Sequence, residues 1–158
     1  MLTRTRTITV NAAFLHDLKE DNIHLRELLI ALNQALAQPM HRPVQPAILA
    51  ELLGRLRDQL ATHFALEEFF GYFNDAVNVA PRLSVQADIL RSQHVALFSE
   101  ICDLVDDAES LLYQESRIIG VDDVAQRYQL FNKHLRSHET CENELILNAL
   151  NDDMGGGD

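Results

Sequence analysis

The chain has 158 residues, of which 47% are hydrophobic and 23% are charged, a composition typical of a folded globular domain. Its formal net charge of −11, from 24 acidic and 13 basic residues, argues against nucleic acid or an anionic membrane as a partner, because both need a basic surface. No apolar run reaches the roughly 18 residues of a membrane span. No long apolar core follows the N-terminal arginines, so we do not expect this segment to be a secretory signal. We expect one soluble domain over residues 1–158.

The first predicted helix follows a short N-terminal arm. Threonine and arginine alternate near the start, and we expect residues 1–11 to be extended. Asn11 is a suitable N-cap for a helix from about 12 to 37. Leucines then recur in steps that keep to one face of this helix: Leu15, Leu18, Leu25, Leu29, Leu32 and Leu36.

Prolines lead into the second predicted helix. Pro39 and Pro43 lie in a short linker, and Pro46 suits the first turn of a helix that ends at about Tyr72. Its inward stripe combines leucines with ionisable groups: Leu49, Leu53, Leu56, Leu60, His63, Glu67 and Phe70. His63 and Glu67 are four residues apart, so they lie one above the other on one helix face.

The third predicted helix carries a single histidine on its inward face. Pro81 and Ser84 mark its start. The stripe that follows places His94 among apolar side chains: Ala87, Leu90, His94, Leu97, Ile101, Leu104, Ala108 and Leu111. This histidine therefore occupies a position that the pattern otherwise reserves for an apolar residue.

The fourth predicted helix repeats the spacing seen in the second. Asp122 or Asp123 caps it after a loop that ends at Gly120. Its inward stripe contains a second His-x-x-x-Glu pair: Val124, Tyr128, Phe131, Leu135, His138, Glu142, Leu145 and Ala149. The glycine-rich tail, residues 152–158, is expected to be mobile.

Four long amphipathic helices with short connections indicate an all-α fold, an up-down-up-down four-helix bundle over about residues 12–150. In that topology the second and fourth helices run parallel, so His63 and His138 lie at similar heights, as do Glu67 and Glu142. Two buried carboxylates repel each other unless positive charge lies between them. One divalent cation or two would supply it, and imidazole with carboxylate suits iron, manganese or zinc.

A structural role is the alternative for each of these residues. A lone histidine on an apolar face is commonly a hydrogen-bonded core residue, and one His-x-x-x-Glu pair on a helix is commonly a surface coincidence. The metal interpretation is favoured because three histidines and two glutamates occupy apolar positions on three helices: His63, Glu67, His94, His138 and Glu142.

The remaining ionisable residues have weaker patterns. His16 and His24 point away from the apolar face of the first helix, and His41 lies in the linker. His134 flanks the fourth stripe, either as hydrogen-bond support for a metal ligand or as a boundary residue. The charge of Glu68 is expected to be solvated.

The two cysteines, Cys102 and Cys141, are far apart in the sequence, which favours free thiols in a reducing cytoplasm over a single disulfide. Cys141 lies beside the fourth stripe, where a packed thiol is favoured over a metal ligand. We therefore expect a cytoplasmic protein.

Taken together, the motifs resemble those of the hemerythrin-like (HHE cation-binding) family over about residues 12–150. They are His63-x-x-x-Glu67 followed by Glu68, then Gln93-His94, then His138-x-x-x-Glu142. The resemblance implies a non-haem di-iron centre bridged by two carboxylates and an oxo or hydroxo group. It also implies that His63 and His138 hold one iron, that Glu67 and Glu142 bridge, and that His94 serves the other iron.

The first helix departs from the family pattern, in which a histidine follows an aspartate in this helix. Here Asn22 follows Asp21, on what a helical wheel gives as the inward side near Leu25 and Leu29. An amide oxygen is a weaker ligand for iron than imidazole. The second ion would therefore be weakly held or absent, with Asp21 or Asn22 as helpers, and an open coordination position would favour reaction with a small molecule.

These observations predict a metal-binding protein that binds or senses oxygen or a related small diatomic. One alternative is a redox enzyme that handles peroxide or nitric oxide in stress defence or repairs iron centres. Another is a degenerate bundle that acts as an interaction module. Metal content separates the last from the others, and repeated turnover separates the enzyme from the sensor.

Overall fold

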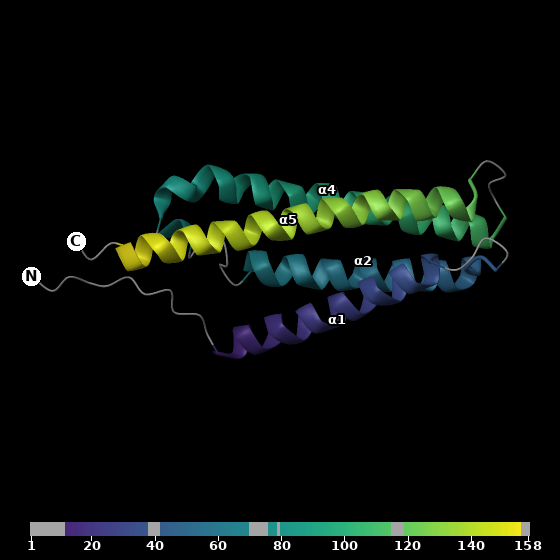
Figure 1. The fold of residues 1–158 in the computed structure, drawn as a ribbon, viewed down its shortest axis with the longest axis horizontal. Helices are drawn as coiled ribbons and strands as arrows, with labels where there is room; N and C mark the ends of the chain where they lie inside the picture. Colours follow the sequence, from purple (N-terminus) through teal and green to yellow (C-terminus); the bar gives the residue numbers. More distant parts are fainter. Residues whose placement is uncertain (1–11, 38–41, 70–75, 79, 115–118, 156–158) are drawn as a thin grey trace, which may run out of the picture.

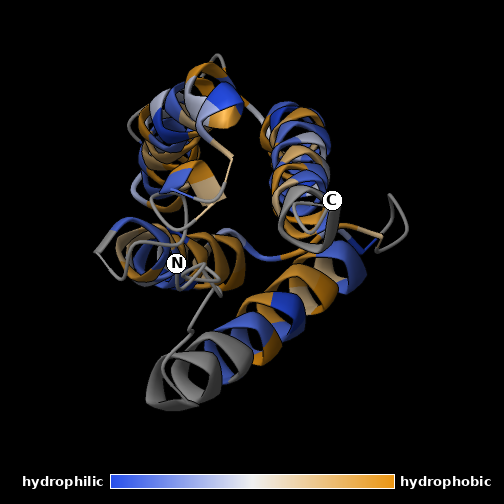
Figure 2. Cartoon of the chain, turned by 90° about the vertical axis from the view of Figure 1, so that its left-hand side faces the viewer, coloured by the Kyte–Doolittle hydropathy of each residue, from blue (hydrophilic) through white to orange (hydrophobic). Residues whose placement is uncertain are grey.

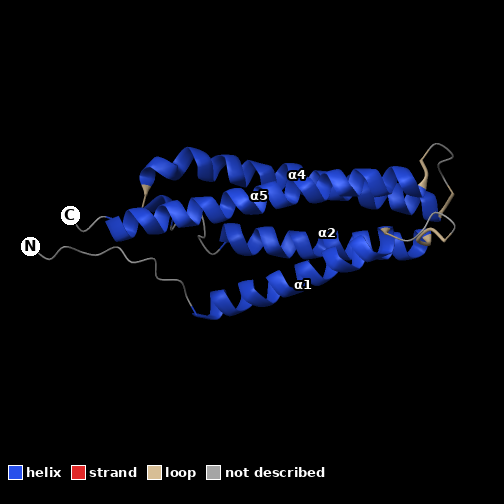
Figure 3. Ribbon diagram, viewed as in Figure 1, coloured by secondary structure: helices blue, strands red, loops and turns tan. Residues whose placement is uncertain are grey.

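Four long helices make up most of the part of the chain that the structure describes. The structure, a computed structural model, describes residues 12–37, 42–69, 76–78, 80–114 and 119–155, without the side chains of 12–19, 69 and 152–155. The elements are α1 (Ala12–Leu36), α2 (Pro46–Phe69), the short 3-10 helix η1 (Pro81–Leu83), α4 (Ser84–Leu112) and α5 (Val121–Gly155). Within these described ranges there are helices and loops and no strand (Figure 3). The predicted all-α class is therefore confirmed.

The long helices lie lengthwise beside one another, and consecutive helices run in alternate directions (Figure 1). The main contacts join α1 to α2, α2 to α4 and α4 to α5. Viewed end-on, the helices surround a common axis and α1 runs obliquely to the others (Figure 2). Towards its N-terminal end α1 diverges from α2, so the seam between α1 and α5 is the least tightly closed side of the bundle.

Local sequence accounts for where the helices begin and end. Pro46 begins α2 and Ser84 begins α4, as the sequence predicts. The expected aspartate cap of α5 is wrong in detail, because the helix already begins at Val121. Asp123 instead reaches back from within the first turn and accepts a hydrogen bond from the Gly120 backbone N–H at 2.8 Å.

The C-terminal tail differs from the expectation of a mobile segment beginning at residue 152, because α5 continues as helix to Gly155. Residues 156–158 lie outside the described part of the chain. So do the predicted arm at residues 1–11, the proposed Asn11 cap and His41.

Two apolar clusters fill the bundle and are separated along its length by a polar layer. The larger cluster contains leucines of all four long helices together with Phe64, Tyr128 and Phe131. The smaller cluster is built around Leu90 and Leu145. Along α5 the buried stripe passes from Phe131 and Leu135 in the large cluster, through His138 and Glu142, to Leu145 and Ala149 in the small one. The predicted stripes of α2, α4 and α5 are buried almost throughout their described residues.

The buried face of α1 is rotated from the one predicted. Asp21, Leu25, Leu28 and Leu32 are buried, whereas Leu29 is only partly buried. The predicted inward face included Leu29 and placed Asn22 on the same side. The physical reason for the difference is that α1 packs mainly on α2 and diverges from the rest, so only the side towards α2 is covered.

Two further expectations can be compared with the structure. No helix in the described part of the chain is long and apolar enough to cross a membrane. Cys102 and Cys141 are both partly exposed and are not joined to each other, which confirms the prediction of free thiols.

Candidate metal centre

The polar layer contains every residue that the sequence proposed as a ligand. His63, Glu67, His94, His138 and Glu142 are each at most 5% exposed, although histidine and glutamate are seldom buried without a specific reason. Each comes from the inward stripe of its helix, with two from α2, one from α4 and two from α5. The helical periodicity that buries leucine above and below them also brings these side chains together.

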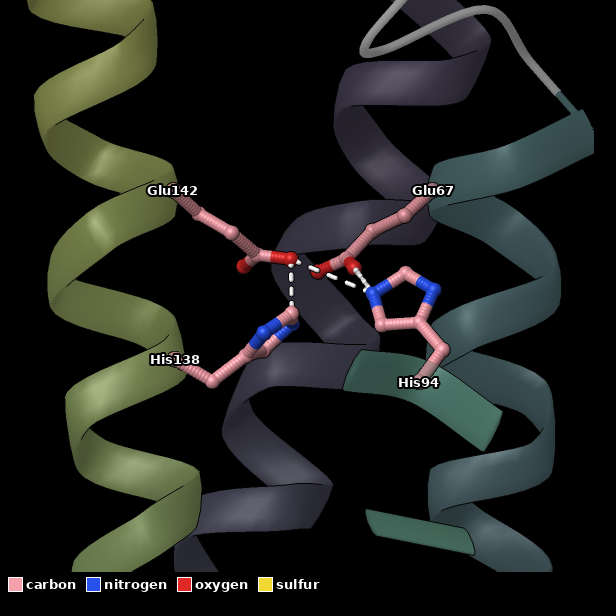
Figure 4. Close-up of side chains that lie close together, drawn as sticks. All are labelled: Glu67, His94, His138 and Glu142. Atoms are coloured by element: carbon pink, nitrogen blue, oxygen red, sulfur yellow. Dashed lines mark hydrogen bonds and ion pairs between the residues drawn. The ribbon is translucent and has the colours of Figure 1, made fainter. Parts of the chain in front are cut away.

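Four of the five form a compact cluster (Figure 4). One ligand atom from each of Glu67, His94, His138 and Glu142 lies within 4.8 Å of all the others. In the close-up the side chains point toward one another, with His138 and Glu142 on one side and Glu67 and His94 facing them. Two imidazoles and two carboxylates that converge in this way are a set that iron, manganese or zinc would accept.

Within this cluster the imidazole Nε2 atoms face the carboxylate oxygens. Nε2 of His138 lies 2.8 Å from Oε1 of Glu142. Nε2 of His94 lies 2.9 Å from Oε2 of Glu67 and 3.3 Å from Oε1 of Glu142. His94 thus contacts carboxylates from two different helices.

His63 lies beside this cluster and shares one of its carboxylates. Its Nε2 is 2.7 Å from Oε1 of Glu67, whose other oxygen faces His94. Glu67 therefore lies between two histidines and offers one oxygen to each, as a bridging carboxylate would. The grouping differs from the pairing that the family resemblance implied, because the compact cluster joins His138 with His94, while His63 faces the other oxygen of Glu67.

The opposite nitrogen of each imidazole is held by a partner. Nδ1 of His63 lies 2.5 Å from Oδ2 of Asp21, Nδ1 of His94 lies 2.8 Å from Oε1 of Glu68, and Nδ1 of His138 lies 2.8 Å from Oε1 of Gln93. Each partner atom is an acceptor, so Nδ1 carries the proton and donates it. Nε2 is then free to offer its lone pair to the centre of the layer, an arrangement that is usual around metal-bound histidine.

Asp21 also anchors α1 to α2. Its second oxygen, Oδ1, accepts a hydrogen bond from Nε2 of Gln59 at 2.6 Å. Asp21 was proposed as a helper, and the structure places it behind His63 as a hydrogen-bond acceptor. Gln59 was not singled out, although it lies one turn before His63 on the same helix, which could have drawn attention to it.

Glu68 is the other partner that sequence reasoning missed. Its charge was expected to be solvated, and its side chain is indeed 47% exposed, yet it holds Nδ1 of His94. The available signal was its position directly after Glu67, on the edge of the helix that faces α4.

Several buried atoms in the layer have no hydrogen-bond partner among the described residues. They are Nε2 of His63, Nε2 of His138 and Oε2 of Glu67. The neighbouring carboxylate and imidazole atoms are within 3 Å, but they are not aligned as donor and acceptor. A buried polar atom without a partner is costly. Buried imidazole and carboxylate atoms that converge and leave three of their number without a hydrogen bond are arranged as ligands are around a cation.

Proton binding is the other way in which the metal-free layer can be neutralised. Burial lowers the pKa of His63, but the adjacent carboxylates of Asp21 and Glu67 outweigh this effect and raise that pKa to about 10. Burial also lowers the pKa of His94, but the adjacent carboxylates of Glu142, Glu67 and Glu68 outweigh this effect and raise the pKa to about 9. Burial acts to raise the pKa of Glu67, whereas His63 and His94 bring it down to about 2. Without a cation, imidazolium groups therefore balance the carboxylates.

An apolar wall separates the layer from the large core. The Phe64 ring stacks on His94 with 4.2 Å between ring centroids and 15° between planes, and its edge faces His138 at 6.0 Å. Phe64 is itself buried. The cluster is therefore shielded from water on this side, which strengthens every charge interaction within it.

Between α1 and α5 the layer opens into a cavity of about 410 Å³. His63, Glu67 and Glu142 form part of its wall. Most of the remaining lining is polar or charged and comes from the facing sides of the two helices: Asn22, Arg26, Asn33, Asn132, Arg136, Glu139 and Asn143. A small molecule thus has a polar route to the carboxylates.

The helix-one and flanking candidates lie outside the cluster. Asn22 is exposed, which contradicts its predicted inward position, although it lines the cavity. His24 is exposed as predicted, 3.9 Å from Glu27. His134 is exposed and pairs with Glu100 at 3.0 Å, so it is a boundary residue rather than a support for a ligand. The side chain of His16 is outside the described residues.

Glu139 is a cavity residue that sequence reasoning passed over. It follows His138 directly and is only partly buried. Burial raises its pKa, and the charges that act on it belong to His63, Glu142, Glu67 and His138. Its carboxyl group therefore lies within the electrostatic reach of the polar layer.

Comparison with known proteins agrees with this arrangement. The model of the hemerythrin HHE cation-binding domain matches residues 13–150. The chain belongs to this family. The match covers all four long helices, including every residue of the polar layer. Among curated proteins and among solved structures, no match is found.

The donor set fits the cation that the family name implies. The chain provides three imidazoles with fixed tautomers, two carboxylates between them, and buried atoms that have no partner among the described residues. A metal-binding site within a hemerythrin-like bundle is what the geometry and the family match together support.

Proposed function

We propose that this hemerythrin-like protein holds a non-haem iron centre in its polar layer and there binds or senses oxygen or a related small diatomic molecule. The observation that carries the proposal is the convergence of imidazole Nε2 atoms and the Glu67 and Glu142 carboxylates in a buried layer. Nε2 of His63, Nε2 of His138 and Oε2 of Glu67 have no hydrogen-bond partner there among the described residues. Manganese or zinc would accept the same ligands. Zinc, however, has no redox change with which to bind oxygen reversibly.

Each part of the site has a role in this proposal. Glu67, His94, His138 and Glu142 would hold the first ion, and His63 would help to hold a second one that shares Glu67 and Glu142. Asp21, Glu68 and Gln93 orient the imidazoles. Bound iron would supply a reversible redox centre for the diatomic.

The surroundings of the site support binding or sensing over a defined turnover. Phe64 excludes water from one side, and the cavity between α1 and α5 gives a small ligand access from the other. The net charge of −11 supports a protein that acts without nucleic acid or an anionic membrane as a partner. The two free thiols support the cytoplasm as its location.

A redox enzyme acting on peroxide or nitric oxide is the second candidate, and the cavity is the observation that favours it. At about 410 Å³ it is larger than a diatomic molecule needs, and Arg136 and Glu139 stand in its wall. Repeated turnover of peroxide or nitric oxide by the iron-loaded protein, absent from a Glu67→Gln variant, would favour the enzyme. Stoichiometric binding without turnover would favour the sensor.

Metal analysis combined with spectroscopy tests the proposal. Protein incubated anaerobically with Fe²⁺ and then dialysed should retain iron, and its visible absorption should change on exposure to air. The His138→Ala variant should retain much less. Protein that stays folded but retains no transition metal after this treatment would contradict the proposal and would leave an interaction module as the better interpretation.

A further inference from the structure

Among the side chains that the structure describes, the cavity side of the polar layer has no imidazole from the first helix, where the family pattern would supply one. Of these described side chains, His63 is the one histidine that lines the cavity. On the described part of α1, both Asn22 and His24 are exposed, and Asp21 is occupied by His63 and Gln59. A cation next to His63 would therefore have no nitrogen ligand from the described side chains of α1.

His63 nevertheless has the features of a ligand. Its side chain is 5% exposed, its Nδ1 is held by Asp21, and its Nε2 has no hydrogen-bond partner among the described residues. A nitrogen that is buried and oriented, and that makes no aligned hydrogen bond even to the Glu67 oxygen 2.7 Å away, points to an additional group on this side of Glu67.

Glu139 is a carboxylate of α5 that lines the same cavity as His63. It lies three residues before Glu142, so the two share a helix face, and both line the cavity with His63 and Glu67. It is partly buried and makes no hydrogen bond or ion pair with any described residue. Arg136 stands three residues earlier in the same cavity wall, yet the two form no ion pair, so the Glu139 carboxylate is not engaged by this guanidinium.

We propose that Glu139 takes the ligand place left by the missing helix-one histidine, and that with His63, Glu67 and Glu142 it binds a second divalent cation on the cavity side. This inference rests on the proposed function, because the first ion is the one held by Glu67, His94, His138 and Glu142. A site with one imidazole and several carboxylates suits Fe²⁺, Mn²⁺ or Co²⁺. Its opening to the cavity makes the second ion the more readily exchanged of the two.

Titration with Co²⁺ separates the two ions without requiring any activity. Wild-type protein, stripped of metal, should bind two Co²⁺ per chain, with the second more weakly held. Glu139→Gln keeps the size of the side chain and removes its charge, so it should keep the first ion and bind the second about 10-fold more weakly or worse, since even outer partners of metal ligands have effects of that size. The matched control is Glu144→Gln, an exposed glutamate of the same helix outside the cavity lining, which should behave as wild type.

Two further variants keep the test decisive. Glu139→Asp retains a carboxylate and should bind the second ion better than Glu139→Gln. Adding Asn22→His to Glu139→Gln should restore part of the second site, because Asn22 lines the same cavity from α1. Circular dichroism of each variant shows whether the bundle is intact, and the rise in melting temperature on adding Co²⁺ provides an independent readout of binding.

The outcomes distinguish this inference from the function on which it rests. A wild-type chain that binds one Co²⁺, or a Glu139→Gln variant that binds two as tightly as wild type, would overturn the role of Glu139 and leave the first site intact. Loss of both ions from folded Glu139→Gln would also overturn it, by showing that Glu139 supports the whole layer. A wild-type chain that binds no Co²⁺, Mn²⁺ or Fe²⁺ would overturn the proposed function itself.

Discussion

The half of the polar layer that faces α4 and the half that faces α1 are built differently. Towards α4, the cluster of Glu67, His94, His138 and Glu142 is buried and covered by the Phe64 ring. Towards α1, His63 faces a cavity of about 410 Å³ whose wall is mostly polar. A buried, preorganised set of ligands holds an ion tightly, whereas an open set exchanges it and admits other molecules.

The difference follows from how the helices pack. α4 packs against both α2 and α5, and leucines of all three helices lie in the large apolar cluster, so the ligands that these helices carry are fixed relative to one another. α1 contacts mainly α2 and diverges towards its N-terminal end. Its polar attachment near the layer is Asp21, which bonds to Gln59 and His63. The open half is therefore the half whose outer helix diverges from its neighbours.

The largest expected effect comes from removing a ligand of the closed half. His138→Ala should abolish tight metal binding, and it leaves Glu142 buried without the imidazole 2.8 Å away. Loss of a partner from a buried ionic network should cost about 3 kcal/mol or more. His63→Ala should instead retain one tight ion. Metal content after dialysis and denaturant unfolding measure both effects.

His134→Ala provides the matched control, because His134 lies one turn earlier on α5 and its pair with Glu100 is exposed. It should change stability by less than about 1 kcal/mol and leave metal content unaltered. If His63→Ala and His138→Ala lost metal equally, the two halves of the layer would not differ in how tightly they hold an ion.

The next effect should come from the support behind His63. Asp21→Asn keeps the side-chain volume but removes the charge that faces Nδ1 of His63. The imidazole then loses basicity and orientation, so affinity for the second ion should fall by about 10- to 100-fold. Co²⁺ titration measures it, and the tight first ion serves as the internal control. If the affinity for the second ion were unchanged in this variant, the role of Asp21 would be limited to anchoring α1 to Gln59.

The sequence predicted the closed half more completely than the open half. The stripes of α2, α4 and α5 have one continuous apolar face each, so periodicity alone could place inward all four residues of the closed half, Glu67, His94, His138 and Glu142. His63 is the one ligand of the open half that the same periodicity placed correctly. The match of the family model to residues 13–150 confirms the family that these motifs indicated.

The open half was predicted less well because α1 has leucines on adjacent faces. Leu28 and Leu29 both fit a helical stripe, and only the packing on α2 decides that Leu28 is the buried one. That choice also decides between Asp21 and Asn22, which differ by one residue and about 100° on the wheel. Contacts made across helices, such as Glu68 with His94, have no spacing rule in the sequence.

A smaller effect is expected from the support behind His94. Glu68→Gln keeps an acceptor for Nδ1 of His94 and removes a charge that is 47% exposed and partly screened by water. The first ion should be bound only a fewfold more weakly, in contrast to the effect of Asp21→Asn on the second. Competition with a chelator of known affinity measures the difference. A loss of affinity as large as the one expected for Asp21→Asn would show that the solvent exposure of Glu68 does not weaken its support of His94.

The smallest effect is expected for His24→Ala on α1. His24 is 64% exposed, and its distance of 3.9 Å from Glu27 makes their pair a weak one. Stability should change by less than roughly 0.5 kcal/mol, as for other surface substitutions, and both Co²⁺ affinities should match those of wild type. A selective loss of the second ion would mean that α1 rotates when metal binds and brings His24 to the cavity. His24, rather than Glu139, would then replace the missing histidine, and the half facing α1 would close around its ion as the other half does.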